Sequence, residues 1–185
     1  MNDRMPPIPA AQLSPEQQAA AAELSASARG SVFGPFVPLI RSPELLNRLQ
    51  RLGQYLRYES ALEPRLSEMG ILVIARFWSQ QYEWHIHHPI ALKAGLHAAK
   101  ADAIAEGRRP DAMGEDEAAL YDVLDEILRT QTVSDPTWAR AVAAFKERGV
   151  IDLLGLAGYY STLAMVMNAA RTPLPPGVAA PLRRL

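Results

Sequence analysis

The sequence predicts a single all-α domain, because apolar residues recur at helical spacing, helix-capping motifs are frequent, and no segment alternates with the two-residue period of a strand. A chain of 185 residues with 49% hydrophobic and 21% charged residues can bury a substantial core. Residues 1–13 are rich in proline and are expected to form an extended arm. Residues 14–185 are expected to form the helical domain.

The composition argues against several classes of partner and of chemistry. A formal net charge of -1 gives no reason to expect binding to nucleic acid or to an anionic membrane. The absence of cysteine excludes disulfides, thiolate nucleophiles and thiolate metal ligands. Since no run approaches the roughly 18 apolar residues of a membrane span, and the N-terminus lacks the apolar region of a signal peptide, we expect a cytoplasmic protein.

Capping motifs mark where the first helices begin. Residues 14–17, SPEQ, combine an N-cap serine, a proline at the first helical position and a capping-box glutamine, which predicts a helix up to about residue 28. Residues 30–41 mix glycine and proline with large apolar side chains. This mixture is typical of an ordered, irregular loop that packs on the core and is in a position to line a pocket. Residues 42–44, SPE, predict a second helix up to about residue 58.

Two helices are expected to meet in the middle of the chain. Pro64 predicts the start of a central helix up to about residue 81, and a second helix follows from about residue 82 until Gly95 provides a left-handed end. Pro89 lies inside the second helix and is expected to kink it or to remove one backbone hydrogen bond. Further helices are predicted over residues 97–106, 115–129, 135–148 and 150–171, the last rich in small residues that permit close packing against a neighbour or another subunit.

Residues 64–96, PRLSEMGILVIARFWSQQYEWHIHHPIALKAGL, combine a long apolar run with a dense set of titratable side chains. Because the run is apolar almost all round the helix, the helix is expected to be buried. Glu83 and His87 are four residues apart and project from one face, whereas His85 and His88 point in other directions. A short antiparallel reversal can bring Glu68 back to the same place. A carboxylate facing an imidazole is an acid–base pair.

This stretch resembles the core of the carboxymuconolactone decarboxylase family, whose wider superfamily includes the alkyl hydroperoxidase D (AhpD) proteins. The similarity continues into GSVFGPFVPLIRSPEL before it and YYSTLAMVMNAARTPLPPG after it, about three quarters of the chain. The resemblance implies an AhpD-like helical bundle that assembles into trimers or hexamers. The peroxidase branch has a glutamate, a CxxC pair beginning twelve residues later, and a histidine four residues beyond the second cysteine. Here that spacing runs from Glu68 to His87 and places Gln80 and Glu83 at the cysteine positions.

Without thiols, peroxide reduction through cysteine does not carry over, and the remaining Glu-Glu-His set resembles the decarboxylase branch. The resemblance implies a cofactor-free lyase that acts on a small carboxylated lactone or a related intermediate of aromatic degradation. We assign His87 as proton donor, Glu83 as its partner or the second acid/base, and Glu68 as a relay. The candidate residues for shaping the cavity wall or attracting the acidic substrate are Arg76, Tyr82, Trp84 and Tyr160.

Other interpretations remain open at this point. In one alternative, Glu68 simply forms an ion pair with Arg65. In another, Arg76 is the buried or interfacial partner of an acidic side chain. The alternative function for the whole protein is that of a non-catalytic helical oligomer of the same family, which binds a small acid. A metal-dependent hydrolase is a third hypothesis, but we predict no metal site, because an HxHH run on one helix scatters its ligands and no HExxH motif is present.

Overall fold

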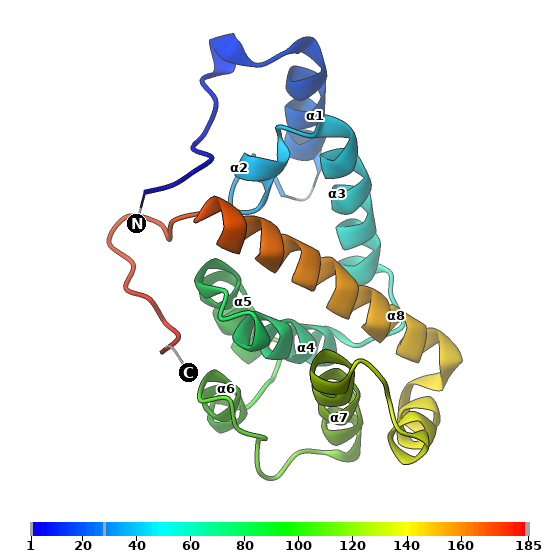
Figure 1. Ribbon diagram of the computed structural model, residues 1–185. Coiled ribbons are helices and arrows are strands. Elements are labelled where there is room, and N and C mark those ends of the chain that lie inside the picture. Colours follow the sequence, from blue (N-terminus) through cyan, green and yellow to red (C-terminus); the bar gives the residue numbers. More distant parts are fainter. Residues whose placement is uncertain (1, 28, 184–185) are drawn as a thin grey trace.

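The computed structural model describes residues 2–27 and 29–183, and this part of the chain is helical throughout with no strand, which confirms the predicted fold class. Figure 1 shows a long helix, α8, crossing the molecule, with α1 to α3 on one side and α4 to α7 on the other. The helices are α1 Pro15–Ala26, α2 Phe36–Leu39, α3 Pro43–Tyr58, α4 Pro64–Phe77, α5 Gln81–Lys93, α6 Ala98–Ala105, α7 Glu115–Thr130 and α8 Asp135–Ala170, preceded by a 3-10 turn, η1 Ala10–Gln12.

Helix α4 is the centre of the fold, because it packs against α5, α6, α7 and α8. Every residue from Leu66 to Arg76 is buried, as its apolar sequence predicts. The helix ends at Phe77, about four residues earlier than expected, since Ser79 adopts a left-handed backbone conformation (φ 49°) and turns the chain into α5. Helix α5 then runs through Pro89 and ends before Gly95, whose φ of 100° confirms the predicted left-handed position.

The two predicted C-terminal helices are both present and together make up α8. Lys146 leaves helical geometry between them (φ 61°, ψ 170°), so the chain kinks there, close to the expected interruption near residue 149. By length and composition α8 qualifies as a membrane span. However, 56% of its most apolar 18-residue window is buried inside the fold, as expected for the core helix that Figure 1 shows.

The N-terminal helices follow their capping motifs with two differences. Ser14 and Gln17 form the predicted capping box, whereas the Ser42 side chain makes no capping bond, and α3 begins at its proline alone. The expected end of the first helix at residue 28 lies outside the described residues, and α1 ends at Ala26. The loop over residues 30–41 is less irregular than expected, because it contains the turn of helix α2.

Candidate functional site

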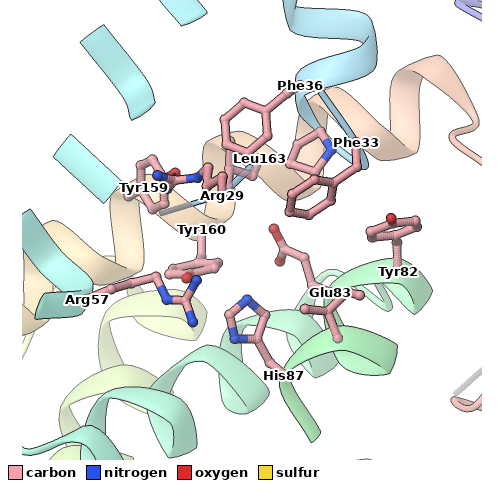
Figure 2. Close-up of a pocket in the computed structure, with 12 residues that line it drawn as sticks. Arg29, Phe33, Phe36, Arg57, Tyr82, Glu83, His87, Tyr159, Tyr160 and Leu163 are labelled. Carbon is pink, nitrogen blue, oxygen red and sulfur yellow. The ribbon is translucent and has the colours of Figure 1, made fainter. Parts of the chain in front are cut away.

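A cavity of about 60 Å³ lies where α5, α3 and α8 meet the segment before and at the start of α2. Figure 2 shows its side chains converging from these elements, with Arg57, Tyr160 and His87 close together and Phe33 and Phe36 across the cavity from them. The lining residues are Arg29, Phe33, Pro35, Phe36, Arg57, Tyr82, Glu83, Ile86, His87, Tyr159, Tyr160 and Leu163. Thus the expected pocket beside residues 30–41 is present, and Tyr82, Glu83, His87 and Tyr160 all face it.

His87 is held by Glu68 from the neighbouring helix. The imidazole Nδ1 lies 2.7 Å from the Glu68 Oε2, and both residues are only 6% exposed. A carboxylate only accepts hydrogen bonds, so this contact places a proton on Nδ1 and leaves Nε2 to point into the cavity, as Figure 2 shows for the second ring nitrogen. The two helices therefore bring together side chains that are 19 residues apart.

The simple ion pair between Glu68 and Arg65 is not formed. Arg65 binds Asp116 and Glu117 instead, at 2.5 and 2.8 Å. Glu68 lies in the second turn of α4 and not in the first, with its Oε1 3.6 Å from the Arg57 guanidinium. The carboxylate thus has a cation on one oxygen and the imidazole on the other, which fixes the orientation of both partners.

Glu83 is a buried carboxyl group without a hydrogen-bond partner. It is 3% exposed, and neither of its oxygens is bonded within the described part of the chain. Burial raises the pKa of Glu83 well above the ordinary value of a glutamate, because the ionised form loses its hydration. Figure 2 shows its carboxyl group rising into the cavity between the His87 ring and Phe33. It therefore retains its proton to higher pH than an exposed glutamate.

Residues that local spacing did not reveal complete the polar end of the cavity. Arg57 contributes a guanidinium whose Nε is buried without a partner, and Arg29 donates to the Tyr159 hydroxyl at 3.2 Å. Two guanidinium groups thus line the cavity, and one of them, that of Arg57, lies 3.6 Å from the Glu68 carboxylate. These residues come from α3, α8 and the segment after α1, and only tertiary packing brings them together.

Tyr160 supplies a protonated hydroxyl next to the imidazole. Its ring meets the His87 ring edge-on, with 5.2 Å between centroids and an angle of 90°. Burial raises the pKa of Tyr160 well above its ordinary value, so the hydroxyl stays a hydrogen-bond donor at neutral pH. Arg57 lies on the same side of the cavity (Figure 2).

The turn before α5 is fixed by Gln80, one of the two residues at the cysteine positions of the resemblance. Its side-chain oxygen accepts from the backbone N–H groups of Tyr82 and Glu83, at 2.6 and 3.3 Å. Its amide nitrogen donates to Asn168 of α8 at 3.0 Å. Gln80 therefore caps the helix and ties the first turn of α5, which carries Glu83, to α8.

Arg76 does not lie at this cavity, contrary to the expectation for a substrate-binding residue there. Its guanidinium donates to the carbonyl groups of Ala105 and Arg183 and to the Ser79 hydroxyl. The reason is helical geometry: Arg76 follows Glu68 by eight residues, about 12 Å along the axis of α4. No acidic partner pairs with it in the described residues either, so the alternative of a buried ion pair is not seen.

Trp84 also lies away from the cavity. Its ring stacks on His88, with 5.8 Å between centroids and 19° between planes, and both line a different hollow together with His85. Trp84 and His88 are four residues apart, as Glu83 and His87 are, so each pair lies on one face of α5. A position directly after Glu83 therefore turns the tryptophan about a hundred degrees away from the cavity.

Gly34 allows Tyr82 to close one wall, and its replacement by alanine is expected to destabilise the protein. Its φ is +52°, and a Cβ there would lie 2.7 Å from the Tyr82 ring. The backbone strain costs about 1–2 kcal/mol, and the clash adds to it. Gly30→Ala is the matched control, since Gly30 has a φ of +74° with nothing within 4 Å of its Cβ position. Urea unfolding should show a larger loss for Gly34→Ala than for Gly30→Ala. Equal losses would contradict the proposed contact.

Comparison with solved structures defines the class of fold. An alkylhydroperoxidase AhpD core protein from Ralstonia eutropha JMP134, described as an uncharacterized peroxidase-related protein, matches with a TM-score of 0.75 and 15% identity, over 95% of this chain and 94% of that one. A peroxidase-related protein from Silicibacter sp. TM1040 gives 0.72 and 15%, over 95% and 94%. The debrominase Bmp8 in complex with 2,3,4-tribromopyrrole gives 0.70 and 14%, over 98% and 95%. The fold is AhpD-like.

Comparison with family models finds a match over part of the chain. Residues 43–126 match the Carboxymuconolactone decarboxylase family. The matched segment includes α3, α4, α5 and α6 and carries Arg57, Glu68, Glu83 and His87, and the resemblance drawn from the sequence is confirmed. No curated protein matches the sequence at a significant level.

Proposed function

We propose that the protein is a cofactor-free lyase that removes carbon dioxide from a small carboxylated lactone or a related intermediate of aromatic degradation. One observation carries the proposal: the Glu68-bound imidazole of His87 and the proton-retaining carboxyl group of Glu83 face the same arginine-lined cavity. Two titratable groups in one site, each held in a different environment, are the arrangement that acid–base chemistry uses.

Binding of an acid follows from the charges of the cavity. Arg29 and Arg57 attract the carboxylate of the substrate, and burial favours the uncharged form of Glu83, which does not repel it. The rings of Phe33 and Phe36 form an apolar wall that takes water away from the bound group. A carboxylate without hydration loses carbon dioxide, a neutral product, more easily.

The reaction needs one proton and no oxidant or reductant. The bond between the carboxylate carbon and its neighbour breaks, carbon dioxide departs, and the electron pair moves onto the conjugated lactone carbonyl as an enolate. The Tyr160 hydroxyl is the donor to the enolate oxygen. The protonated imidazole of His87, stabilised by Glu68, delivers a proton from Nε2 to carbon, and Glu83 serves as the second acid that restores it.

The size of the cavity limits the substrate. Its volume of about 60 Å³ is smaller than the roughly 150 Å³ that holds a benzene ring in an engineered cavity. The enclosed space therefore fits the carboxylate and the adjacent reacting carbon atoms. The rest of a lactone ring has to extend toward the partly exposed Phe33 and Tyr82, which move to admit it.

The proposal includes the homo-oligomer, a trimer or hexamer, that the resemblance implies. Ile151 and Met165 are large apolar residues on the outer face of α8, and Gly158 lies midway between them with open space around it. Their seven-residue spacing places all three on one stripe, which suits packing against another helix. The molar mass in solution, measured by light scattering, tests this expectation.

The test of the reaction is the release of carbon dioxide from carboxymuconolactone and related small lactone acids in D₂O. We expect carbon dioxide and a product that carries one deuterium on the carbon that receives the proton. A non-catalytic acid-binding protein is the alternative, and it predicts binding without release. A ligand at a hundred times its Kd raises the unfolding free energy by about 2.7 kcal/mol, so thermal shift detects it. Binding of these acids without carbon dioxide release would overturn the lyase proposal in favour of that alternative.

A further inference from the structure

A second cavity of about 240 Å³ lies between α4, α6 and α7. It shares no lining residue with the first one, so the two are separate. Most of its wall is apolar, formed by Val73, Phe77, Ile104, Tyr121 and Leu128. Phe77 is 45% exposed, which is unusual for a phenylalanine of the central helix and places an aromatic ring at the solvent edge of the cavity.

Arg76 gives this apolar cavity a positive charge. The residue is 5% exposed, and its three hydrogen bonds go to two carbonyl groups and to the Ser79 hydroxyl, all uncharged. Its Nε is buried without a partner, and within the described residues no carboxylate forms an ion pair with it. Burial lowers the pKa of Arg76, yet a guanidinium remains charged at neutral pH. A buried cation without an anion is costly, and a bound anion would remove that cost.

The other charged groups of the cavity cancel each other. Asp125 binds Arg129 with 2.6 Å between Oδ1 and Nε, one turn apart on α7. The cavity therefore keeps the single positive charge of Arg76 among hydrocarbon and aromatic walls. Its volume exceeds the roughly 150 Å³ at which an engineered cavity holds benzene. A ring of that size with one carboxylate attached fits both the space and the charge.

We propose that this cavity is a second ligand site, which binds a small apolar monocarboxylate with its carboxylate on the Arg76 guanidinium and its hydrocarbon part against Val73, Phe77 and Leu128. The site is independent of the proposed lyase reaction. An uncharged ligand of the same shape leaves the guanidinium unpaired and binds more weakly, because the buried cation then keeps its desolvation cost.

Calorimetric titration of the full chain with benzoate tests the site, with benzamide as the uncharged control. We expect benzoate to bind, benzamide to bind at least tenfold more weakly, and Arg76→Met to lose at least tenfold in benzoate affinity. Arg57→Met, which removes a cation of the first cavity, should leave this affinity unchanged.

A second variant tests the same cavity if Arg76→Met folds poorly. Leu128→Trp fills the cavity from a partly exposed position on α7 and leaves Arg76 in place. It should also weaken benzoate binding at least tenfold. Benzoate affinity that survives both changes, that is lost in Arg57→Met instead, or that benzamide equals, would overturn the proposal, as would no binding to the unaltered protein.

Discussion

Replacing His87 with alanine is expected to lower kcat/KM for the lactone acid by about 10²–10⁴-fold, the usual contribution of a positioned general acid. The imidazole is the group that Glu68 orients toward the cavity, and no other histidine among the described residues lines that cavity. Steady-state measurement of carbon dioxide release gives the comparison. The fold should survive, because the change removes a side chain that lines an existing cavity.

His88→Ala is the matched control. His88 is the next residue in the chain, but it stacks on Trp84 beside a different hollow, so its loss should leave kcat/KM within a factor of about two. A reaction that tolerates His87→Ala, or one that loses as much with His88→Ala, would contradict the assignment of the proton donor.

Replacing Glu83 with glutamine is expected to make the protein more stable than the wild type at pH 7. Burial raises the pKa of Glu83 in the folded protein above its ordinary value of 4.5, so between those two values the folded state binds a proton that the unfolded state has released. The contribution of Glu83 to stability is therefore complete below about pH 4.5 and is lost as pH rises toward the folded pKa. The loss reaches about 1.4 kcal/mol per pH unit in that window.

Urea unfolding of both proteins between pH 5 and pH 7 measures this difference. Glutamine has the same shape and does not titrate, so the advantage of Glu83→Gln over the wild type should grow with pH. Glu147→Gln is the control, because Glu147 is exposed on α8 and its change should leave the pH dependence as it is. Stability curves that run parallel for wild type and Glu83→Gln would show that Glu83 ionises normally.

The part of the site that lies within one helix could be predicted from the sequence. A spacing of four residues places Glu83 and His87 on one face of a helix whatever surrounds it, and both line the cavity. The left-handed end at Gly95 and the capping box at Ser14 follow equally local rules. The contact of His87 with Glu68 needed one more condition, a tight reversal between α4 and α5, which the chain makes through the left-handed Ser79.

The part that depends on tertiary packing could not be predicted in this way. Arg57 reaches the cavity because α3 packs against α8, and Arg29 because it binds Tyr159 of α8, and no spacing in the sequence reports these contacts. The same limit explains the two misplaced residues. Arg76 belongs to the correct helix but lies more than two turns beyond Glu68, and Trp84 lies on the next face of α5.

The proposed chemistry depends most on a proton-bearing Glu83 beside an imidazole held by Glu68. Infrared difference spectroscopy between the wild type and Glu83→Gln at pH 7 measures that proton directly, without a substrate. We predict the carbonyl band of a protonated carboxylic acid, present in the wild type, shifted in D₂O and absent from the variant. The bands of an ionised carboxylate in its place would contradict the account.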